Sequence, residues 1–123
     1  MSSIRYVGID VHKKRAEVCI IDETGKIVLR SPVAVERSFL QSFARSTLHK
    51  TDCIALEATT NSWAVAEILR PFVAEVTVSN PMATKAIASS KVKTDKVDAL
   101  VLAQLLRCDY LPKVWEPDEA TKQ

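Results

Sequence analysis

Glycine and aromatic residues are scarce in this sequence, and long apolar runs are absent. Of the 123 residues, 2 are glycine, 5 are proline and 6% are aromatic, which excludes collagen-like chains and low-complexity chains rich in glycine or proline. No apolar run approaches the length of a membrane span, and the first residues lack the charged and then apolar layout of a signal peptide. We therefore expect a cytoplasmic protein that does not enter a membrane.

Cysteine is also rare. The residues Cys19, Cys53 and Cys108 are odd in number, lie far apart and have apolar neighbours. This pattern predicts neither a disulfide framework nor a zinc knuckle. We expect the three thiols in the hydrophobic core.

The residues that are present are typical of one folded domain. Hydrophobic residues make up 47% of the chain, charged residues 26%, and the net charge is +2, which predicts an ordered globule of single-domain length. We assign the domain to residues 1–108, and a polar tail broken by Pro112 and Pro117 to residues 109–123. The tail is expected to lead toward a further domain that this chain does not include.

The spacing of apolar residues predicts three strands, followed by helices and strands in alternation. Residues 4–10, 16–22 and 26–31 have strand patterns, and the turn at 22–26 is expected to place Gly25 in a left-handed conformation. Helices are expected at 35–48, from Asn61 or Ser62 to 69, and over 97–106, with strands at 53–57 and 73–78. This order predicts an α/β fold of the ribonuclease-H-like kind, with a mixed sheet. The aromatic residues expected in its core are Phe39, Phe43 and Trp63.

Four acidic residues stand where a metal site can form. Asp10 and Glu57 each end a predicted strand, and sites in open sheets gather beyond the carboxyl ends of central strands. Asp95 and Asp98 are three positions apart at the start of the last helix, so they project from one face. Hard cations such as Mg²⁺ take carboxylate oxygens as ligands, and paired ions can catalyse phosphodiester cleavage. Each acid alone is also explained as a surface residue or, for the last pair, as Asp95 capping the helix with Asp98 in its first turn, where the helix dipole favours negative charge.

Basic residues lie close to these acids in the sequence. Lys13 and Lys14 follow Asp10, and residues 82–94 contain Lys91 and Lys93 but no acid, with Lys96 just beyond. Clustered lysines attract a phosphate backbone, although solvated surface lysines are common. We predict that these five lysines contact nucleic acid.

Four segments carry a resemblance to a known family. They are Gly8-Ile9-Asp10-Val11-His12-Lys13, Ala55-Leu56-Glu57-Ala58-Thr59, Val78-Ser79-Asn80-Pro81 and Lys93-Thr94-Asp95-Lys96-Val97-Asp98-Ala99. Their order and spacing over residues 4 to about 107 resemble the N-terminal domain of the DEDD transposases, the IS one-ten family of bacterial insertion sequences, which includes the Piv-type invertases. The last segment is the most specific. The chain departs from many relatives at Thr60-Asn61-Ser62-Trp63, where they have a glycine and an aromatic residue.

The resemblance implies a domain similar to the RuvC Holliday-junction resolvase. Asp10, Glu57, Asp95 and Asp98 would form an acidic tetrad that holds Mg²⁺ or Mn²⁺, with two ions when substrate is bound. The family also implies DNA as substrate, a noncoding bridge RNA that guides it, a homo-oligomer, and a separate C-terminal domain with a nucleophilic serine. We therefore do not expect this chain alone to carry out recombination.

Two other functions remain open at this point. Gly8-Ile9-Asp10 followed by the turn at 22–26 also resembles the first phosphate hairpin of sugar kinases and actin-like ATPases, which predicts nucleotide binding. Such hairpins place small residues after the acid so that amides approach phosphate, whereas this chain has Val11, His12 and Lys13. The second alternative is a noncatalytic module that binds nucleic acid, with the acids serving as caps.

Overall fold

The described residues form a mixed sheet with helices on both faces. The computed structural model describes residues 4–59, 61–94 and 96–111, so Asp95 and residues 112–123 of the predicted tail lie outside the described residues. The strands are β1 (Tyr6–Val11), β2 (Arg15–Ile21), β3 (Ile27–Ala34), β4 (Cys53–Glu57) and β5 (Glu75–Ser79). Their order is β3-β2-β1-β4-β5, with β1 to β3 antiparallel and β1, β4 and β5 parallel. The predicted mixed sheet is confirmed.

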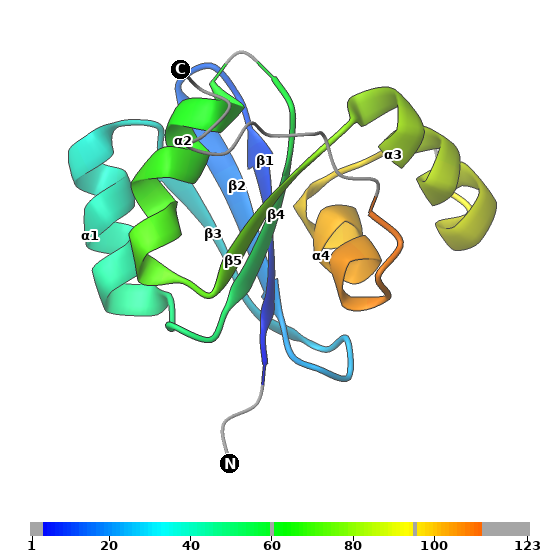
Figure 1. Ribbon diagram of the computed structural model, residues 1–123, viewed down its shortest axis with the longest axis horizontal. Coiled ribbons are helices and arrows are strands. Elements are labelled where there is room, and N and C mark those ends of the chain that lie inside the picture. Colours follow the sequence, from blue (N-terminus) through cyan, green and yellow to red (C-terminus); the bar gives the residue numbers. More distant parts are fainter. Residues whose placement is uncertain (1–3, 60, 95, 112–123) are drawn as a thin grey trace, which may run out of the picture.

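The helices divide between the two faces of this sheet (Figure 1). Helix α1 (Arg37–Thr47) and helix α2 (Ser62–Leu69), which continues into the 3-10 helix η1 (Arg70–Phe72), cover one face. Helix α4 (Ala99–Arg107) packs on the other face, against β1 and β2. Helix α3 (Pro81–Ile87) and the π-helix η2 (Ala88–Val92) extend beyond α4. Across the described ranges, no helix has the length and apolar character needed to span a bilayer.

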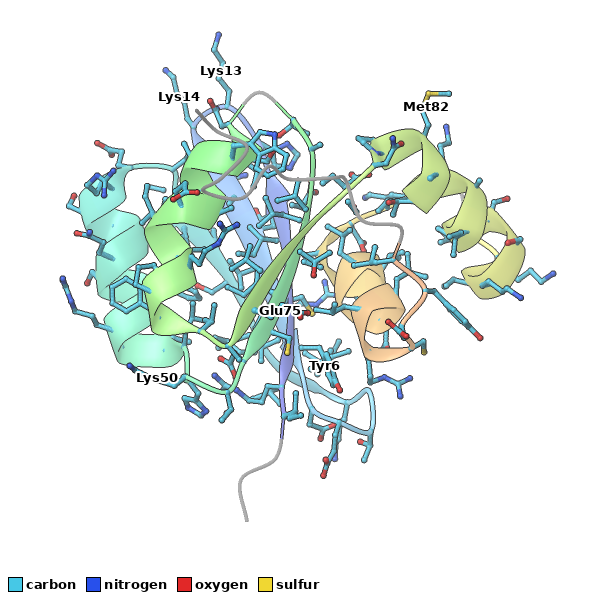
Figure 2. All side chains as sticks on the ribbon, in the orientation of Figure 1. Tyr6, Lys13, Lys14, Lys50, Glu75 and Met82 are labelled. Atoms are coloured by element: carbon cyan, nitrogen blue, oxygen red, sulfur yellow. The ribbon has the colours of Figure 1, made fainter. Side chains whose placement is uncertain are left out.

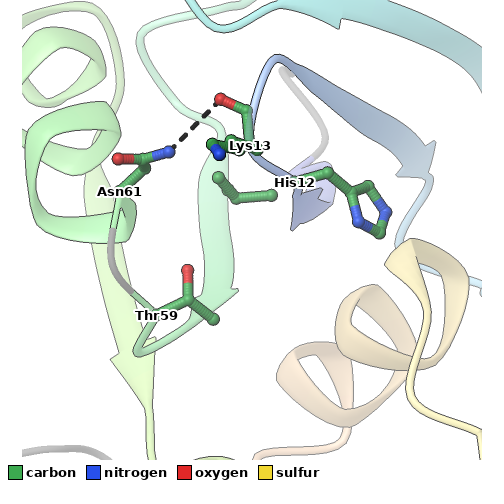
Figure 3. Close-up of a pocket in the computed structure, with 5 residues that line it drawn as sticks. His12, Lys13, Thr59 and Asn61 are labelled. Atoms are coloured by element: carbon green, nitrogen blue, oxygen red, sulfur yellow. Dashed lines mark hydrogen bonds between the residues drawn. The ribbon is translucent and has the colours of Figure 1, made fainter.

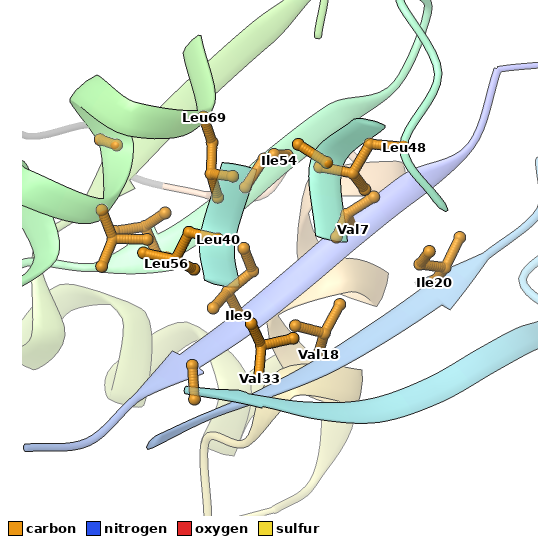
Figure 4. Close-up of a cluster of buried hydrophobic side chains, with 14 of the residues drawn as sticks. Val7, Ile9, Val18, Ile20, Val33, Leu40, Leu48, Ile54, Leu56 and Leu69 are labelled. Carbon is orange, nitrogen blue, oxygen red and sulfur yellow. The ribbon is translucent and has the colours of Figure 1, made fainter. Parts of the chain in front are cut away.

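The main hydrophobic core lies between the sheet and helices α1 and α2 (Figure 4). Successive side chains of a strand point to opposite faces, so Val7 and Ile9 enter this core while Tyr6, Gly8 and Asp10 face α4. Full burial of an aliphatic side chain contributes about 1.5–3 kcal/mol. This alternation decides which residues share the face of α4.

Two predictions about the core are wrong. Phe39 is 55% exposed, because the buried residues of α1 recur every four positions as Leu40 and Ala44 and Phe39 lies on the solvent side of that stripe. Cys108 is exposed because it follows the end of α4, whereas Cys19 is buried and Cys53 is half-buried. Phe43 and Trp63 pack against the core as expected.

The sequence interpretation missed helix α3. We expected a turn at Asn80-Pro81, but Oδ1 of Asn80 accepts hydrogen bonds from the backbone N–H groups of Met82 and Ala83. Asn80 is therefore an N-cap, and Pro81 occupies the first helical position, which is where proline is favoured. An Asn-Pro dipeptide is typical both of turns and of helix starts. Because no clear apolar stripe follows Pro81, the sequence did not indicate a helix there.

An ion pair fixes the amino end of the sheet. The guanidinium of Arg5 donates to both carboxylate oxygens of Asp52, at 2.9 and 2.7 Å, and the backbone N–H of His49 donates to Asp52 at 2.8 Å. The side chain of Asp52 is 0% exposed. The buried carboxylate of Asp52 therefore links Arg5 to the loop before β4 at this end of the sheet.

We expect Asp52→Ala to lower the free energy of unfolding by about 3 kcal/mol, because removal of one partner of a buried ion pair leaves the other uncompensated. Urea denaturation measures the loss. Glu23→Ala, in the exposed turn between β2 and β3, serves as the control and should change stability little. Equal stability of the two variants would contradict the prediction.

Candidate functional site

Asp10 and Glu57 lie side by side at the carboxyl ends of two parallel strands. The parallel pairing of β1 with β4 runs to Ile9 opposite Leu56, and Asp10 and Glu57 are the next residues on each strand. Neighbouring strands are about 4.8 Å apart. Burial raises the pKa of Glu57, and the negative charge of Asp10 raises it further. The structure therefore brings together two of the predicted site residues.

Asp98 faces the same region from the start of helix α4. It is the N-cap of the helix, and its Oδ1 accepts a hydrogen bond from the backbone N–H of Val101 at 3.0 Å. Asp10 and Asp98 line one cleft of about 370 Å³, together with Lys96. A carboxylate has two oxygens, so the cap leaves Oδ2 of Asp98 available to a ligand.

Gly8 allows α4 to lie directly on β1. A Cβ atom at Gly8 would collide with the carbonyl oxygen of Ala99 and would lie 2.8 Å from the backbone nitrogen of Ala103. This close approach brings the first turn of α4 over β1, two residues before Asp10. Gly8 belongs to a segment that carried the family resemblance, but its packing role was not recognised from the sequence.

The donors present fit a hard divalent cation, although the set is not complete within the described part of the chain. In residues 4–59, 61–94 and 96–111, no three Asp, Glu, His or Cys side chains are grouped so that they could hold one metal ion. Asp95, the fourth predicted ligand, lies outside the described residues. Asp10, Glu57 and Asp98 offer the carboxylate oxygens that Mg²⁺ and Mn²⁺ prefer.

His12 contacts the acidic edge. Its Nε2 lies 3.2 Å from Oδ2 of Asp10, and the two side chains are 59% and 28% exposed. An imidazole that shares a proton with a carboxylate occupies one of its oxygens. A cation bound at Oδ2 of Asp10 would therefore have to displace this contact.

Three residues near the acids were missed from the sequence: Glu17, Arg30 and Ser79. Glu17 is paired with Asp10 across β1 and β2, and it lines the cleft with Arg30. Ser79 is paired with Glu57 across β4 and β5. The sequence could have indicated Glu17, because side chains alternate along a strand and its neighbours Ala16 and Val18 face the main core. Glu17 must then point to the opposite face, as Asp10 does.

The hydroxyl of Ser79 is a buried polar group without a hydrogen-bond partner in the described part of the chain. Ser79 is 0% exposed, and its Oγ forms no hydrogen bond with any residue that the structure describes. An unsatisfied buried hydroxyl costs about 1–3 kcal/mol. Such a group beside Glu57 is an observation of this structure that fits a polar ligand at the sheet edge.

The predicted lysines lie in three places. Lys13 and Lys14 project from the loop after β1, at the carboxyl edge of the sheet, while Figure 2 shows Tyr6, Lys50 and Glu75 lower in the same view. The ammonium of Lys91 lies 5.6 Å from the ring centre of Tyr110, which is beyond the end of α4. Lys93 follows η2 as its C-cap, with a φ of 63°. Lys96 lines the acidic cleft. The contact of all five with nucleic acid stays a prediction.

A second pocket adjoins the acidic edge. It has a volume of about 340 Å³ and is lined by Val11, His12, Lys13, Thr59 and Asn61. Nδ2 of Asn61 donates to the carbonyl of Lys13 at 3.3 Å (Figure 3). Asn61 is at the N-cap position of α2 but makes no capping hydrogen bond with its side chain. The expected cap at Asn61 is thus replaced by a bond to the loop after β1.

In the turn at 22–26, the amides of Thr24, Gly25 and Lys26 donate to Asp22 and are not free for a phosphate. Oδ1 of Asp22 accepts from the backbone N–H groups of Thr24 and Lys26, and the hydroxyl of Thr24, with these amides, holds the pKa of Asp22 below its usual value. Gly25 has a φ of 92°, as predicted, and its carbonyl accepts from Gln104 of α4 at 2.9 Å. The turn packs against α4, and its amides face its own aspartate.

Comparisons with known proteins identify the family and the fold. A model of the DEDD transposase family of IS110 insertion sequences, described as Transposase, matches residues 7–123. The protein y4qE of Sinorhizobium fredii (strain NBRC 101917 / NGR234), which is named as a transposase, is 30% identical over 121 residues. The match covers 93% of this chain and 30% of y4qE, so the chain spans less than a third of that relative.

A solved structure shows the same fold. RuvC of T. thermophilus, in complex with Holliday junction substrate, matches with a TM-score of 0.52 and 10% identity, over 90% of this chain and 99% of that chain. The predicted ribonuclease-H-like fold is confirmed. Since the family model covers the chain from β1 to its last residue, the chain belongs to the DEDD transposases of the IS one-ten (IS110) family.

Proposed function

We propose that this domain binds Mg²⁺ or Mn²⁺ through Asp10, Glu57, Asp95 and Asp98 and takes part in cutting and rejoining DNA. The main support is the placement of Asp10 and Glu57 on adjacent carboxyl ends of parallel strands in a chain of a transposase family. Asp98, which lines the same cleft as Asp10, extends the set from the opposite side.

The electrostatics of the edge favour a cation. The pKa of Glu57 is raised by burial and by the charge of Asp10, and positive charge between the two would favour both ionised forms. When bound, a pair of divalent ions would supply Lewis acidity for phosphodiester cleavage. The protein's part is to hold the carboxylates in place: β1 and β4 fix Asp10 and Glu57, and the N-cap hydrogen bond fixes Asp98.

DNA is the proposed partner. The solved structure with this fold, RuvC, is in complex with a Holliday junction, and Lys13, Lys14 and Lys96 lie at the same edge as the acids. Lys91 and Lys93 would contact DNA farther out, near the end of η2. Neutralisation of phosphates by lysines makes binding salt-dependent, so affinity should fall steeply between low and moderate salt.

The proposal also covers the full-length protein, its guide RNA and its oligomeric state. The natural protein would be longer than this chain, with residues 109–123 leading to a C-terminal domain that supplies the nucleophile. It would act in the cytoplasm of a bacterium as a homo-oligomer guided by a noncoding bridge RNA. The relative y4qE, of which this chain covers 30%, supports a longer protein.

The test is a titration of the full-length protein with Mn²⁺ by calorimetry. Glu57→Gln should weaken binding by about tenfold or more, since even partners of metal ligands contribute that much. Glu75→Gln is the matched control, because Glu75 begins β5 at the opposite end of the sheet and should leave binding unchanged. Wild-type affinity in the Glu57 variant would overturn the proposal.

A further inference from the structure

Ser79 stands beside Glu57 on the same face of the sheet. In the parallel pairing of β4 with β5, Glu57 is opposite Ser79. The preceding pair, Leu56 and Val78, enters the core beneath α1 and α2, so the pair of Glu57 and Ser79 points to the other face. That is the face over which α4 places Asp98.

The backbone that carries this hydroxyl is held in place. The backbone N–H of Ala58 donates to the carbonyl of Ser79 at 2.8 Å, so the β4–β5 pairing continues past Glu57. The next residue, Asn80, caps α3 with its side chain, and its carbonyl accepts from the buried hydroxyl of Thr84 at 2.7 Å. The backbone of Ser79 is thus fixed from both sides, and its hydroxyl can change position only by rotation about χ1.

The chemistry of the pair is complementary. A serine hydroxyl has one O–H to donate, and an ionised carboxylate only accepts. Ser79 is 0% exposed and has no hydrogen-bond partner among the described residues, while Glu57 is half-buried next to it. Ser79 is fully buried in the structure, so its hydroxyl is not presented to a DNA backbone.

We propose that Ser79 is a positioning residue: its hydroxyl donates to one carboxylate oxygen of Glu57 and turns the other toward a divalent cation shared with Asp10. The inference rests on the proposed function. The hydroxyl has no hydrogen-bond partner among the described residues, and Glu57 would become its acceptor in the arrangement that holds the cation. Hydrogen bonds of this kind orient metal ligands and raise metal affinity.

The test compares Mn²⁺ binding and metal-free stability in the full-length protein. Ser79→Ala should raise the dissociation constant for Mn²⁺ by about tenfold. In contrast, the urea midpoint of the metal-free protein should stay the same or rise, because the variant removes an unsatisfied buried group. A merely structural serine would give the opposite pair of results, with lower stability and unchanged affinity.

Matched variants make the result specific. Thr77→Val removes a buried hydroxyl from the same face of β5, two residues earlier, and should leave Mn²⁺ affinity unchanged. Ser79→Thr keeps the hydroxyl and should restore most of the binding. If Ser79→Ala did not fold, Ser79→Cys, which has similar volume and a weaker donor, carries the same prediction.

The outcomes separate this inference from the proposed function. Unchanged Mn²⁺ affinity in Ser79→Ala, with binding lost in Glu57→Gln, would overturn the role of Ser79 and leave the metal site standing. Wild-type affinity in both variants, or no binding by the wild-type protein, would overturn both.

Discussion

Asp98→Asn in the full-length protein is expected to slow DNA strand cleavage by about a hundredfold or more, because removal of one electrostatic contributor to a transition state costs that much. Asparagine is as good an N-cap as aspartate, so it can still accept the hydrogen bond from Val101 that Asp98 accepts at 3.0 Å. It lacks the negative charge that makes a carboxylate a strong ligand for Mg²⁺ or Mn²⁺. The variant therefore separates the cap that Asp98 forms in the structure from its proposed role as a metal ligand.

Asp98→Ala is the informative comparison. It should lose cleavage to a similar extent and also lose about 1 kcal/mol of stability through the missing cap. Cleavage of the element's DNA ends and urea denaturation measure the two effects. If Asp98→Asn cleaved at the wild-type rate while Asp98→Ala was merely less stable, Asp98 would be a cap alone and the predicted tetrad would be wrong at this position.

Gly8→Ala is expected to lower the free energy of unfolding by about 3 kcal/mol or more, at the upper end of the cost of overpacking. The added methyl group would meet the backbone of Ala99 and Ala103, and backbone atoms of a packed helix cannot turn aside as a flexible side chain can. Either α4 moves away from β1 or the domain loses much of its stability. Thermal and urea denaturation measure the loss.

Gly25→Ala is the control for this prediction. Its φ of +92° makes alanine unfavourable, but the nearest atoms are those of the flexible Arg107 side chain, at 3.0–3.2 Å. The strain of a left-handed alanine is about 1–2 kcal/mol, so this variant should be clearly the more stable of the two. Equal losses would mean that the contact between Gly8 and α4 is not as close as described.

Much of the fold could be predicted from the sequence because its signals are local. The hairpin at 22–26 follows from an aspartate that binds its own amides and a glycine with positive φ. The strand that ends at Glu57 follows from a short, continuous apolar run. For these elements a few neighbouring residues are sufficient, and tertiary contacts do not change the outcome.

The candidate site was only partly predictable, since it depends on register between distant strands. The ends of β1 and β4 indicated Asp10 and Glu57, but no local pattern aligns Glu17 with Asp10 or Ser79 with Glu57. The cap at Asp98 also differs in detail from the expectation, which allowed Asp95 as the cap. The site is a property of strand pairing and helix docking, and single segments of sequence do not contain it.

The contact between Gly8 and α4 couples the packing of this helix on the sheet to the binding of a ligand at Asp10 and Asp98. Asp10 belongs to the sheet and Asp98 to the leading turn of a helix that is seated on it, so any ligand that bridges the two carboxylates joins two separate pieces of secondary structure. By reciprocity, such a ligand strengthens the seating of α4 by the same free energy that a well-seated α4 adds to the ligand's affinity. Substitutions far from the acids that weaken the packing of α4 on the sheet would therefore also lower the affinity for the cation, as substitutions of the carboxylates would.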